Sequence, residues 1–457
     1  MDRERFTSLI NSFEEEYPVN KWVKNNVELW PLIKMRLFFG FHINNSKTPT
    51  SEKFTERLIK IFKGIWQFIC LFYPFNKSIR VKDIYCLAPH FRYNSETVIK
   101  NRYFNDLIDD VQKCNLDFRL LEYGNTSKEY RNRIDHSKKT IFIENLKYAV
   151  LFLREILWKL RSRKNPDWPD YDKFIEEVNR NFKGAKIEQD HILKQFMYIS
   201  LLKHIYILKF KKFEVENVYL LCYYVSEMYA MNLACNALGI PTWDIQHGGQ
   251  GSQHMAYTNF NKIPDKGYDL LPKNFWCWDE DSAREINKWA KNQSFHKVYV
   301  KGNPWINFCL KNYAISEAVS EKIILYTMQP IDGIILEDYL LNAIKNTKLG
   351  YKWYLRLHPR QLDQKRLLIS VLKDHDLLSK VEIEKATFYP LPALLSQCHI
   401  HISKYSGSIL EAYSIGVKSI IIDPLGRESF PSVAKSDIAT CVLNRDHESL
   451  LNQIYYF

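Results

Sequence analysis

Short, unbroken apolar runs recur in the second half of the chain, and each is followed by a segment with helical spacing. The clearest run is Val218–Tyr224 (VYLLCYY), because a strand buried on both faces shows a continuous apolar stretch. A helix is expected next, with Ser226 as its cap and its end near Gly239, and then a strand over Ile240–Ile245. This order predicts a parallel sheet with a right-handed crossover.

The alternation of apolar strands and periodic helices continues along the chain. It predicts two successive doubly wound units, which is an α/β fold with two Rossmann-like lobes. We expect the ligand in the cleft between these lobes, and residues 305–320 as their connection. Further strands are expected at 274–278, 297–300, 322–327, 352–357, 381–384, 399–402 and 418–422, and further helices at 281–292, 336–347, 364–375, 392–397 and 408–414.

The pattern before Val218 is weaker. It predicts helices up to residue 80, one with Pro31 near its start and one over Phe54–Phe72. Three parts are expected: a helical N-terminal segment at 1–80 packed on the first lobe, an acceptor lobe at 81–310 and a nucleotide-sugar donor lobe at 311–457. The other elements expected in this region are strands at 81–87 and 118–123 and helices at 104–113 and 140–160.

The sequence Arg356-Leu357-His358-Pro359-Arg360 directly follows an expected strand. Ligands of open parallel sheets bind outside the carboxyl ends of the strands. His358 can donate a hydrogen bond to a phosphate there, Pro359 would stiffen the turn, and Arg360 would add positive charge. The alternative is a turn histidine beside a solvated arginine.

A second junction of strand, loop and helix runs from His401 to Ala412 (HISKYSGSILEA). Its loop is small and polar, and the backbone N–H groups at such a helix start form a natural anion site. Ser408 and Glu411 also match a capping box, which needs no ligand. Glu411 therefore has two interpretations, cap partner or acceptor for ribose hydroxyls. The candidate contacts to the donor phosphate and nucleotide are Ser403, Ser406, Gly407, Ser408 and Glu411.

Three glycines fall within four positions after the strand Ile240–Ile245, in the sequence DIQHGGQG. We expect a special backbone there, which places Gln246, His247, Gly248 and Gly249 in the cleft. A histidine with a near-neutral pKa can act as general base on an acceptor hydroxyl. A structural glycine loop with a hydrogen-bonded histidine is the alternative.

The segment Gln329-Pro330-Ile331-Asp332-Gly333 follows the first strand of the second lobe. Gln329 and Gly333 are expected to line the cleft. Asp332 is a candidate catalytic base, and capping of the next helix is the alternative role for it.

The 457 residues carry a formal net charge of +12, and 46% of them are hydrophobic. The charge suits phosphate-rich partners, but no helix-turn-helix, RNP or finger pattern is present, so no nucleic-acid partner is expected. Nine scattered cysteines without a CxxC pair argue against zinc ribbons. No metal or other cofactor is expected, because the D-x-D matches at 170/172, 279/281 and 374/376 have a spacing that is common by chance, and helix capping explains the second.

The N-terminus (MDRER) is charged, and no segment reaches about 18 apolar residues, so we expect neither a signal peptide nor a transmembrane helix. With the cysteine pattern, this predicts a cytoplasmic location. Basic residues surround two apolar stretches, Ile61–Phe72 and Tyr148–Leu160. They suggest docking on the anionic inner face of the cytoplasmic membrane, and core helices of the first lobe are the alternative.

His358-Pro359 and the loop with Ser406 and Ser408 resemble the HP and serine motifs of bacterial sialyltransferases, capsular Kdo transferases and teichoic-acid glycerophosphate transferases. All of these have GT-B folds. In sialyltransferases the two motifs contact the phosphate of CMP, the leaving group. The resemblance therefore implies that His358, Ser406 and Ser408 bind the donor phosphate.

Gln246-His247-Gly248 resembles the histidine–glycine motif of the capsule and teichoic-acid enzymes, where a histidine sits at the catalytic centre. The resemblance covers roughly residues 218–430. It departs from sialyltransferases in one respect, since their acidic motif lies in the first lobe, whereas Asp332-Gly333 lies in the second.

Together these features predict a metal-independent, inverting glycosyltransferase of the GT-B kind. Its donor would be a CMP- or UDP-type nucleotide sugar, and its acceptor a lipid-linked glycan or a surface polysaccharide such as capsule, O-antigen or lipopolysaccharide. Three alternatives stay open: a nucleotide-sugar 2-epimerase, a CDP-glycerol glycerophosphotransferase, and a non-catalytic partner in polysaccharide assembly.

Overall fold

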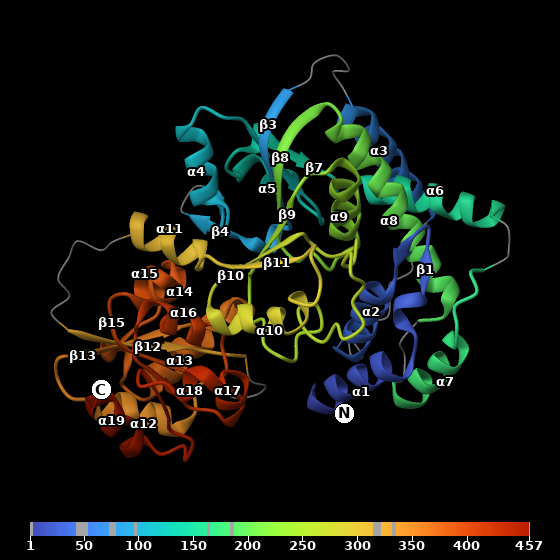
Figure 1. Ribbon diagram of the computed structural model, residues 1–457. Helices are drawn as coiled ribbons and strands as arrows, with labels where there is room; N and C mark the ends of the chain where they lie inside the picture. The colour runs from blue at the N-terminus through green and yellow to red at the C-terminus, as the bar shows by residue number, and fades with distance from the viewer. Residues whose placement is uncertain are drawn as a thin grey trace. The chain divides into compact units, whose positions relative to one another are not determined.

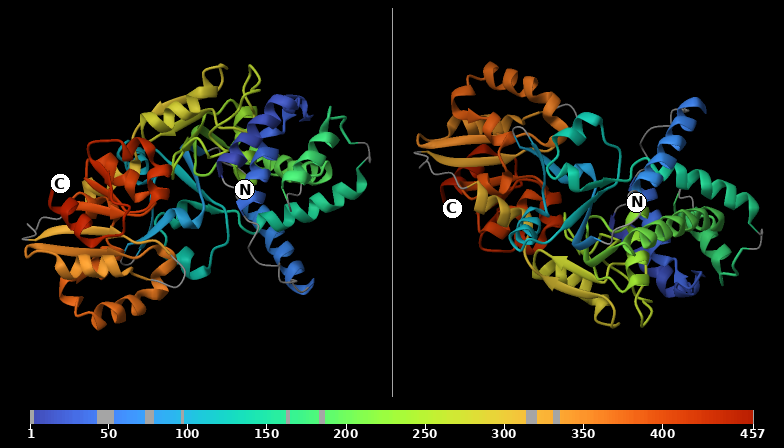
Figure 2. Two further views of the ribbon diagram at one scale, coloured as in Figure 1. Left: turned by 90° about the horizontal axis from the view of Figure 1, so that it is seen from below. Right: turned by 90° about the horizontal axis from the view of Figure 1, so that it is seen from above.

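The structure is a computed structural model of the chain (Figure 1). It describes residues 3–42, 54–72, 79–95, 98–161, 165–182, 187–313, 321–330 and 335–456. The chain divides into two compact units, Met1–Asn303 and Pro304–Phe457, which we call unit 1 and unit 2. Each unit contains one large parallel sheet with helices around it (Figures 1 and 2).

The large sheet of unit 1 has seven strands, and all neighbouring strands are parallel. These are β3 (Ile79–Leu87), β6 (Phe118–Glu122), β7 (Thr140–Phe142), β8 (Phe213–Leu220), β9 (Thr242–Ile245), β10 (Asn274–Cys277) and β11 (Lys297–Val300). In space they follow the order β7-β6-β3-β8-β9-β10-β11. Counted along the chain, this is the 3-2-1-4-5-6 order of a Rossmann sheet with one added strand.

The helices of unit 1 cover this sheet and extend to the N-terminus. They are α1 (Arg3–Glu16), α2 (Trp30–His42), α3 (Phe54–Phe72), α4 (Asn105–Lys113), α5 (Lys128–Arg133), α6 (Leu146–Leu160), α7 (Tyr171–Asn181), α8 (Gln189–Phe210), α9 (Ser226–Leu238) and α10 (Glu280–Ala290). Two antiparallel hairpins pair β1 (Val23–Lys24) with β2 (Val27–Glu28) and β4 (Arg92–Ser95) with β5 (Val98–Asn101).

A buried lysine fixes the first two helices to the rest of unit 1. The ammonium group of Lys34 in α2 lies 3.6 Å from the Glu14 carboxylate of α1. It also donates to the carbonyl oxygens of Thr258 and Asn259 at 2.6 and 2.5 Å. Since a buried charge is tolerated only when it is paired and hydrogen-bonded, this arrangement holds α1 and α2 against the loop that follows β9.

The sheet of unit 2 has six parallel strands. They are β12 (Lys322–Thr327), β13 (Tyr351–Arg356), β14 (Val381–Glu382), β15 (Cys398–Ser403), β16 (Ser419–Ile421) and β17 (Ala439–Cys441). Their spatial order, β14-β13-β12-β15-β16-β17, is again 3-2-1-4-5-6 along the chain. The predicted α/β fold with two Rossmann-like units is therefore confirmed.

Helices cover both faces of the unit 2 sheet, as the side chains of its central strand show. Ile324 and Tyr326 of β12 belong to one core cluster, and Ile323 and Leu325, which point to the other face, belong to another. The helices are α11 (Pro304–Asn312), α12 (Asp338–Asn346), α13 (Lys365–Asp374), α14 (Glu384–Phe388), α15 (Leu391–Leu395), α16 (Ser408–Ile415), α17 (Pro424–Ser429), α18 (Pro431–Ala434) and α19 (His447–Tyr456).

Three local predictions in unit 1 were wrong. The helix expected from Thr140 begins only at Leu146, because residues 140–142 form β7, which pairs with β6. The strand expected to reach Tyr224 ends at Leu220, and the chain then turns through Cys222, whose φ is +64°. Ser226 does not cap α9: its hydroxyl accepts a hydrogen bond from the Gln195 side chain at 3.1 Å.

Candidate functional site

The order of the strands in the unit 2 sheet reverses between β12 and β15, which are its first and fourth strands along the chain. Doubly wound sheets bind ligands at such a switch point, outside the carboxyl ends of the strands. β12 ends there at Thr327, whose side chain is buried. Its Oγ1 lies 2.9 Å from His401 Nε2, 2.9 Å from Ser403 Oγ and 2.8 Å from Ser408 Oγ. One hydroxyl therefore ties the ends of both strands to the start of α16.

The loop between β15 and α16 turns different serines inward and outward. Ser403 and Ser408 are buried in the Thr327 network, whereas Ser406 is half-buried and Gly407 is exposed. The expected capping box is wrong: Gly407 is the N-cap residue of α16, and the Ser408 amide bonds to Ser406 Oγ at 3.3 Å. The Ile409 and Leu410 amides bond to Ser406 O at 3.1 Å and to Gly407 O at 3.0 Å. An anion at this helix start would therefore use the Gly407 N–H and the Ser406 hydroxyl.

Two glycines near this loop allow a direct test of it. Gly407 has a φ of −58°, and no described atom lies within 4 Å of a Cβ placed there. Gly407→Ala should therefore unfold at the wild-type temperature. If a phosphate approaches this backbone, the added methyl group should keep it from one charge-assisted hydrogen bond and weaken nucleotide binding about tenfold. Calorimetric titration measures the affinity, and wild-type affinity would remove the loop from the site.

Gly426 in α17 provides the contrasting variant. A Cβ at Gly426 would collide with the backbone carbonyl oxygen of Lys404, so alanine there must displace the loop. Gly426→Ala is expected to lower both the unfolding temperature and the nucleotide affinity, unlike Gly407→Ala.

Side chains also link the loops that follow β12 and β15. Gln329 Oε1 accepts a hydrogen bond from the Tyr405 amide at 2.9 Å. The ammonium group of Lys404 lies 2.8 Å from the carboxylate of Glu337, which precedes α12. Asp332 and Gly333, a candidate base and a candidate cleft residue, lie outside the described residues, so their roles stay predictions.

His358 follows β13, the strand on the other side of β12. It is half-buried and precedes a short 3-10 helix (Pro359–Gln364), with Pro359 in the first position. Its Nδ1 accepts the Arg360 backbone N–H at 3.1 Å, and burial, with the nearby Arg360 charge, lowers its pKa. A neutral imidazole that accepts at Nδ1 carries its proton on Nε2. His358 therefore offers an Nε2–H donor beside the switch point.

The switch point of unit 1 lies between β3 and β8, and β9 is the next strand. His247 follows β9, with its Nδ1 3.3 Å from the carbonyl oxygen of Ile245 and its Nε2 3.5 Å from the Tyr224 hydroxyl. A neutral ring that donates from Nδ1 to a carbonyl has its lone pair on Nε2. This is the tautomer opposite to that of His358. Each unit thus contains a Rossmann-type sheet and a histidine near the switch point of that sheet.

The electrostatics of His247 differ from the sequence prediction. Burial, with a smaller effect of nearby His90, lowers the pKa of His247 to about 4. The predicted near-neutral pKa is therefore wrong. At neutral pH the ring is uncharged, and its Nε2 lone pair, 3.5 Å from the Tyr224 hydroxyl, can accept a proton.

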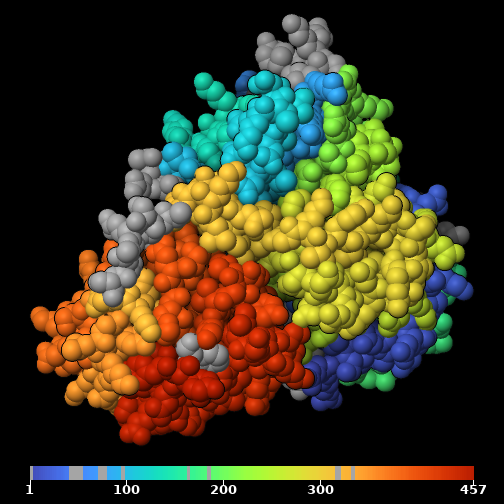
Figure 3. Space-filling view, turned by 60° about the vertical axis from the view of Figure 1, so that its left-hand side comes forward, coloured from blue at the N-terminus to red at the C-terminus, as the bar shows by residue number. Residues whose placement is uncertain are grey.

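The loop around His247 is ordered by its glutamine rather than by its glycines. Gln246 is fully buried, donates from Nε2 to Gly248 O and to Ser282 Oγ at 3.0 Å each, and accepts the Trp278 amide at 2.7 Å. Gly248 and Gly249 have no positive φ, and no described atom lies within 4 Å of a Cβ at either position. The expected special backbone is therefore wrong. Figure 3 shows the segment that follows β9, in yellow, on the surface of unit 1.

Sequence reasoning missed the aromatic and histidine side chains around His247. The ring of Phe91 meets the His247 ring edge-on, with centroids 5.0 Å apart. Tyr103 donates its hydroxyl to the His247 carbonyl oxygen at 3.2 Å. These residues and His90 come from the loops after β3, more than a hundred positions earlier in the chain, so no local motif joins them to His247.

Asp244, two residues before Gln246, gives a stability prediction. It is fully buried and accepts the Tyr223 amide at 3.2 Å and the Tyr257 hydroxyl at 2.9 Å. Burial raises its pKa from 3.8 to about 8. The folded state therefore binds a proton that the unfolded state releases, and stability is lost as the pH rises from about 4 to about 8.

Asp244→Asn should mimic the protonated carboxyl, because an amide can accept from Tyr223 and donate to Tyr257. We expect the unfolding temperature of this variant to gain on that of the wild type as the pH rises. At pH 8 the difference should be several degrees, since 1 kcal/mol is worth about 2–4 °C in domains of roughly this size. Scanning calorimetry from pH 4 to 8 measures it, and a difference that does not change with pH would contradict the raised pKa.

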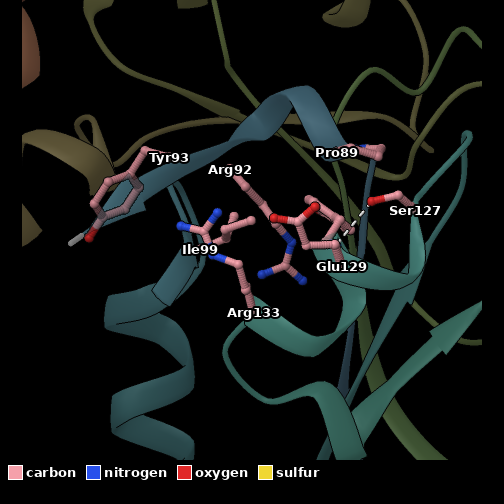
Figure 4. Close-up of a pocket in the computed structure, with 8 residues that line it drawn as sticks. Pro89, Arg92, Tyr93, Ile99, Ser127, Glu129 and Arg133 are labelled. Carbon is pink, nitrogen blue, oxygen red and sulfur yellow. Dashed lines mark hydrogen bonds between the residues drawn. The ribbon is translucent and has the colours of Figure 1, made fainter. Parts of the chain in front are cut away.

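A polar cavity of about 380 Å³ opens in unit 1 beside the carboxyl ends of β3 and β6 (Figure 4). Its buried Arg92 is matched by carboxylates, with Nη2 3.0 Å from Glu122 and Nη1 2.6 Å from Asp135. The exposed Arg133 is a further cation at the wall. The cavity is lined by Pro89, Arg92, Tyr93, Ile99, Ser127, Glu129, Tyr130 and Arg133.

Both aspartates of the D-x-D match at 279/281 have structural partners. Asp279 caps α10, with its Oδ1 accepting the Ser282 amide at 2.7 Å, which confirms the capping interpretation. Asp281 pairs with Arg284 at 2.8 Å. Within the described ranges, no group of three or more His, Cys, Asp and Glu residues could hold a metal ion.

The chain contains two Rossmann-type units, as the predicted GT-B fold requires. No protein-family model and no curated protein matches the sequence. Among solved structures, the chain is similar to the UDP-GlcNAc 2-epimerase from Neisseria meningitidis, with 14% identity, a TM-score of 0.42 and coverage of 82% of this chain and 91% of that one. It is also similar to the glycotransferase of kitacinnamycin (11%, 0.44, 82% and 90%) and to the wall teichoic acid polymerase TagF (10%, 0.44, 88% and 89%).

Proposed function

We propose that this protein is an inverting, metal-independent glycosyltransferase that moves a sugar from a CMP- or UDP-type nucleotide sugar to a surface polysaccharide or lipid-linked glycan. One observation carries the proposal: two histidines stand beside the carboxyl ends of two Rossmann sheets with opposite tautomers. One ring offers a proton and the other accepts one, which is the division of labour that glycosyl transfer needs.

Unit 2 is the proposed donor unit. The Nε2–H of His358, the exposed Arg360 and the start of α16 at Gly407 all belong to loops beside the switch point. A donor N–H, a guanidinium and a helix N-terminus each stabilise negative charge. Together they suit the phosphate that departs with the nucleotide. Ser406 is the proposed hydroxyl contact, while Ser403 and Ser408 support the loop through Thr327.

Unit 1 is the proposed acceptor unit, with His247 as the general base. The bond from Nδ1 to Ile245 fixes the ring and leaves Nε2 to take the proton of an acceptor hydroxyl. The lowered pKa keeps the ring neutral until then. Partial negative charge on the acceptor oxygen in the transition state would favour the charged imidazolium.

The proposed step is a single displacement. The acceptor oxygen forms a bond to the anomeric carbon as its proton moves to His247 Nε2. The bond from that carbon to the phosphate oxygen breaks, and its electron pair leaves with the nucleotide. Because attack and departure occur on opposite faces, the anomeric configuration inverts. Preorganised donors at the leaving phosphate lower the barrier without a metal ion, and each can be worth several kcal/mol.

A thermal-shift screen with CMP, CDP, UDP, GDP and dTDP tests the donor class, since a ligand that binds only the folded state raises the unfolding temperature. The nucleotide sugar of the best nucleotide is then incubated with glycan acceptors in the presence of EDTA. Acceptor-dependent release of nucleotide is expected. Turnover of a UDP-sugar without acceptor would indicate an epimerase instead. If CDP-glycerol is the only donor that is used, the protein is a glycerophosphotransferase. Absence of nucleotide binding would favour a non-catalytic partner.

A further inference from the structure

The largest collection of exposed apolar side chains in the described chain lies on two helices of unit 1, α3 and α6. They hold nearly half of the large hydrophobic residues that are exposed. We call this set the α3–α6 surface. It consists of Leu58, Ile59, Phe62, Ile65, Trp66, Phe68 and Ile69 on α3 and Phe152, Leu153, Ile156, Leu157 and Leu160 on α6.

These residues follow helical spacing and form a stripe on each helix. On α3 they recur at intervals of three and four positions, and Phe62 and Trp66 are each 68% exposed. On α6 the stripe ends at Leu160, which is 76% exposed. An apolar stripe of this kind normally faces the core. Here both stripes are exposed, so the interpretation of the two stretches as core helices is wrong.

The exposed apolar face of α3 does not result from a loosely attached helix, because the opposite face of α3 is firmly packed. Gly64 packs so tightly on α6 that a Cβ there would lie 2.5 Å from the Asn145 carbonyl oxygen. Gln67 donates to Phe142 O at 2.6 Å and accepts the amides of Asn145 and Leu146 at 2.9 and 2.7 Å. The buried face of α3 thus holds the start of α6, and the opposite face is presented outward.

Positive charge borders the two stripes. Lys63 follows Ile59 by four positions, and Lys159 follows Ile156 by three, so each exposed lysine lies next to its stripe. The two helices also carry Arg57, Lys60, Lys147 and Arg154, against the acidic residues Glu56 and Glu155. Glu155 is itself matched by Arg154 at 2.5 Å and by Lys194 at 3.9 Å.

We propose that the α3–α6 surface docks on an anionic lipid bilayer, with both helices lying in the plane of the interface. Apolar side chains enter the boundary of the acyl chains, while the flanking lysines extend to anionic headgroups. No helix of the described residues is long and apolar enough to cross a membrane. A second copy of the chain fits this surface less well, because it would bring basic borders together.

Vesicle flotation without any substrate tests this inference, so its outcome is separate from that of the proposed glycosyl transfer. The wild type should float with vesicles of equal parts phosphatidylglycerol and phosphatidylcholine at low salt, and much less with phosphatidylcholine alone. Phe62→Ser/Trp66→Ser should lower partitioning by about tenfold or more, since each buried aromatic contributes substantially to transfer. Lys63→Glu/Lys159→Glu should lower it on the order of a hundredfold, because each charge counts near an anionic surface.

Matched variants elsewhere in unit 1 serve as controls. Leu208→Ser removes an exposed leucine of α8, and Lys128→Glu/Lys138→Glu reverses two exposed lysines outside the surface. Both should float like the wild type, and circular dichroism should show that all variants fold. Failure of the wild type to bind, equal loss in the controls, or a dimer that Phe62→Ser/Trp66→Ser dissociates in light scattering would overturn the proposal.

Discussion

His247→Ala should lower the rate of sugar transfer by about 10²–10⁴-fold, the usual contribution of a positioned general base. Nucleotide affinity should stay at the wild-type value, because the nucleotide is expected on unit 2. Steady-state kinetics and calorimetric titration measure the two effects. The structural reason is the fixed ring, in which Nδ1 is 3.3 Å from Ile245 O, leaving Nε2 as the only proton acceptor.

Added imidazole separates a catalytic role of His247 from a structural one. A small base that enters the space left by the ring should restore part of the lost rate in His247→Ala. The exposed His204 of α8 provides a matched variant, and His204→Ala should keep full activity. Wild-type rates in His247→Ala, or a loss that accompanies a lower unfolding temperature and does not respond to imidazole, would rule out His247 as the base.

His358→Ala should have a different signature, with loss of both nucleotide binding and transfer. A hydrogen bond to a charged group is worth about 1.5–3 kcal/mol, which predicts roughly a 10- to 100-fold weaker affinity for the nucleotide. The loss in transfer rate should be larger, about 10²–10³-fold, since charge on the leaving phosphate grows in the transition state. The same titration and kinetic assays measure it.

His358→Asn distinguishes phosphate binding from helix capping. His358 caps its 3-10 helix by accepting the Arg360 amide, and asparagine is among the best capping residues. This variant should keep the wild-type unfolding temperature and still lose nucleotide affinity. His375→Ala, in an exposed residue of unit 2, should change neither. Wild-type affinity in His358→Asn would leave capping as the role of His358.

Strands buried on both faces could be predicted from the sequence, whereas pairing could not. Lys322–Thr327 was predicted with its observed bounds, since its apolar residues Ile323–Tyr326 are all buried. The strand at Val218 in fact begins at Phe213, because its polar first half pairs with Ile79 and Arg80 of β3. Such long-range pairing also turned Thr140–Phe142 into β7, within a stretch whose spacing is helical.

The candidate site was predictable only where its residues are close in sequence. The loops of His247, His358 and Ser406 were found because each follows an apolar strand. The network that organises the serine loop was missed, since Thr327 and Ser408 are joined across two strands. The capping box was wrong for the same reason: the Ser408 hydroxyl bonds to Thr327.

Hydrogen–deuterium exchange with and without nucleotide shows whether the carboxyl ends of the unit 2 strands hold the donor phosphate. We expect at least one of CMP, CDP, UDP, GDP and dTDP to slow exchange of the amides at 404–408 and 358–361. Saturating nucleotide that leaves both segments unprotected, or that protects only unit 1, would contradict it.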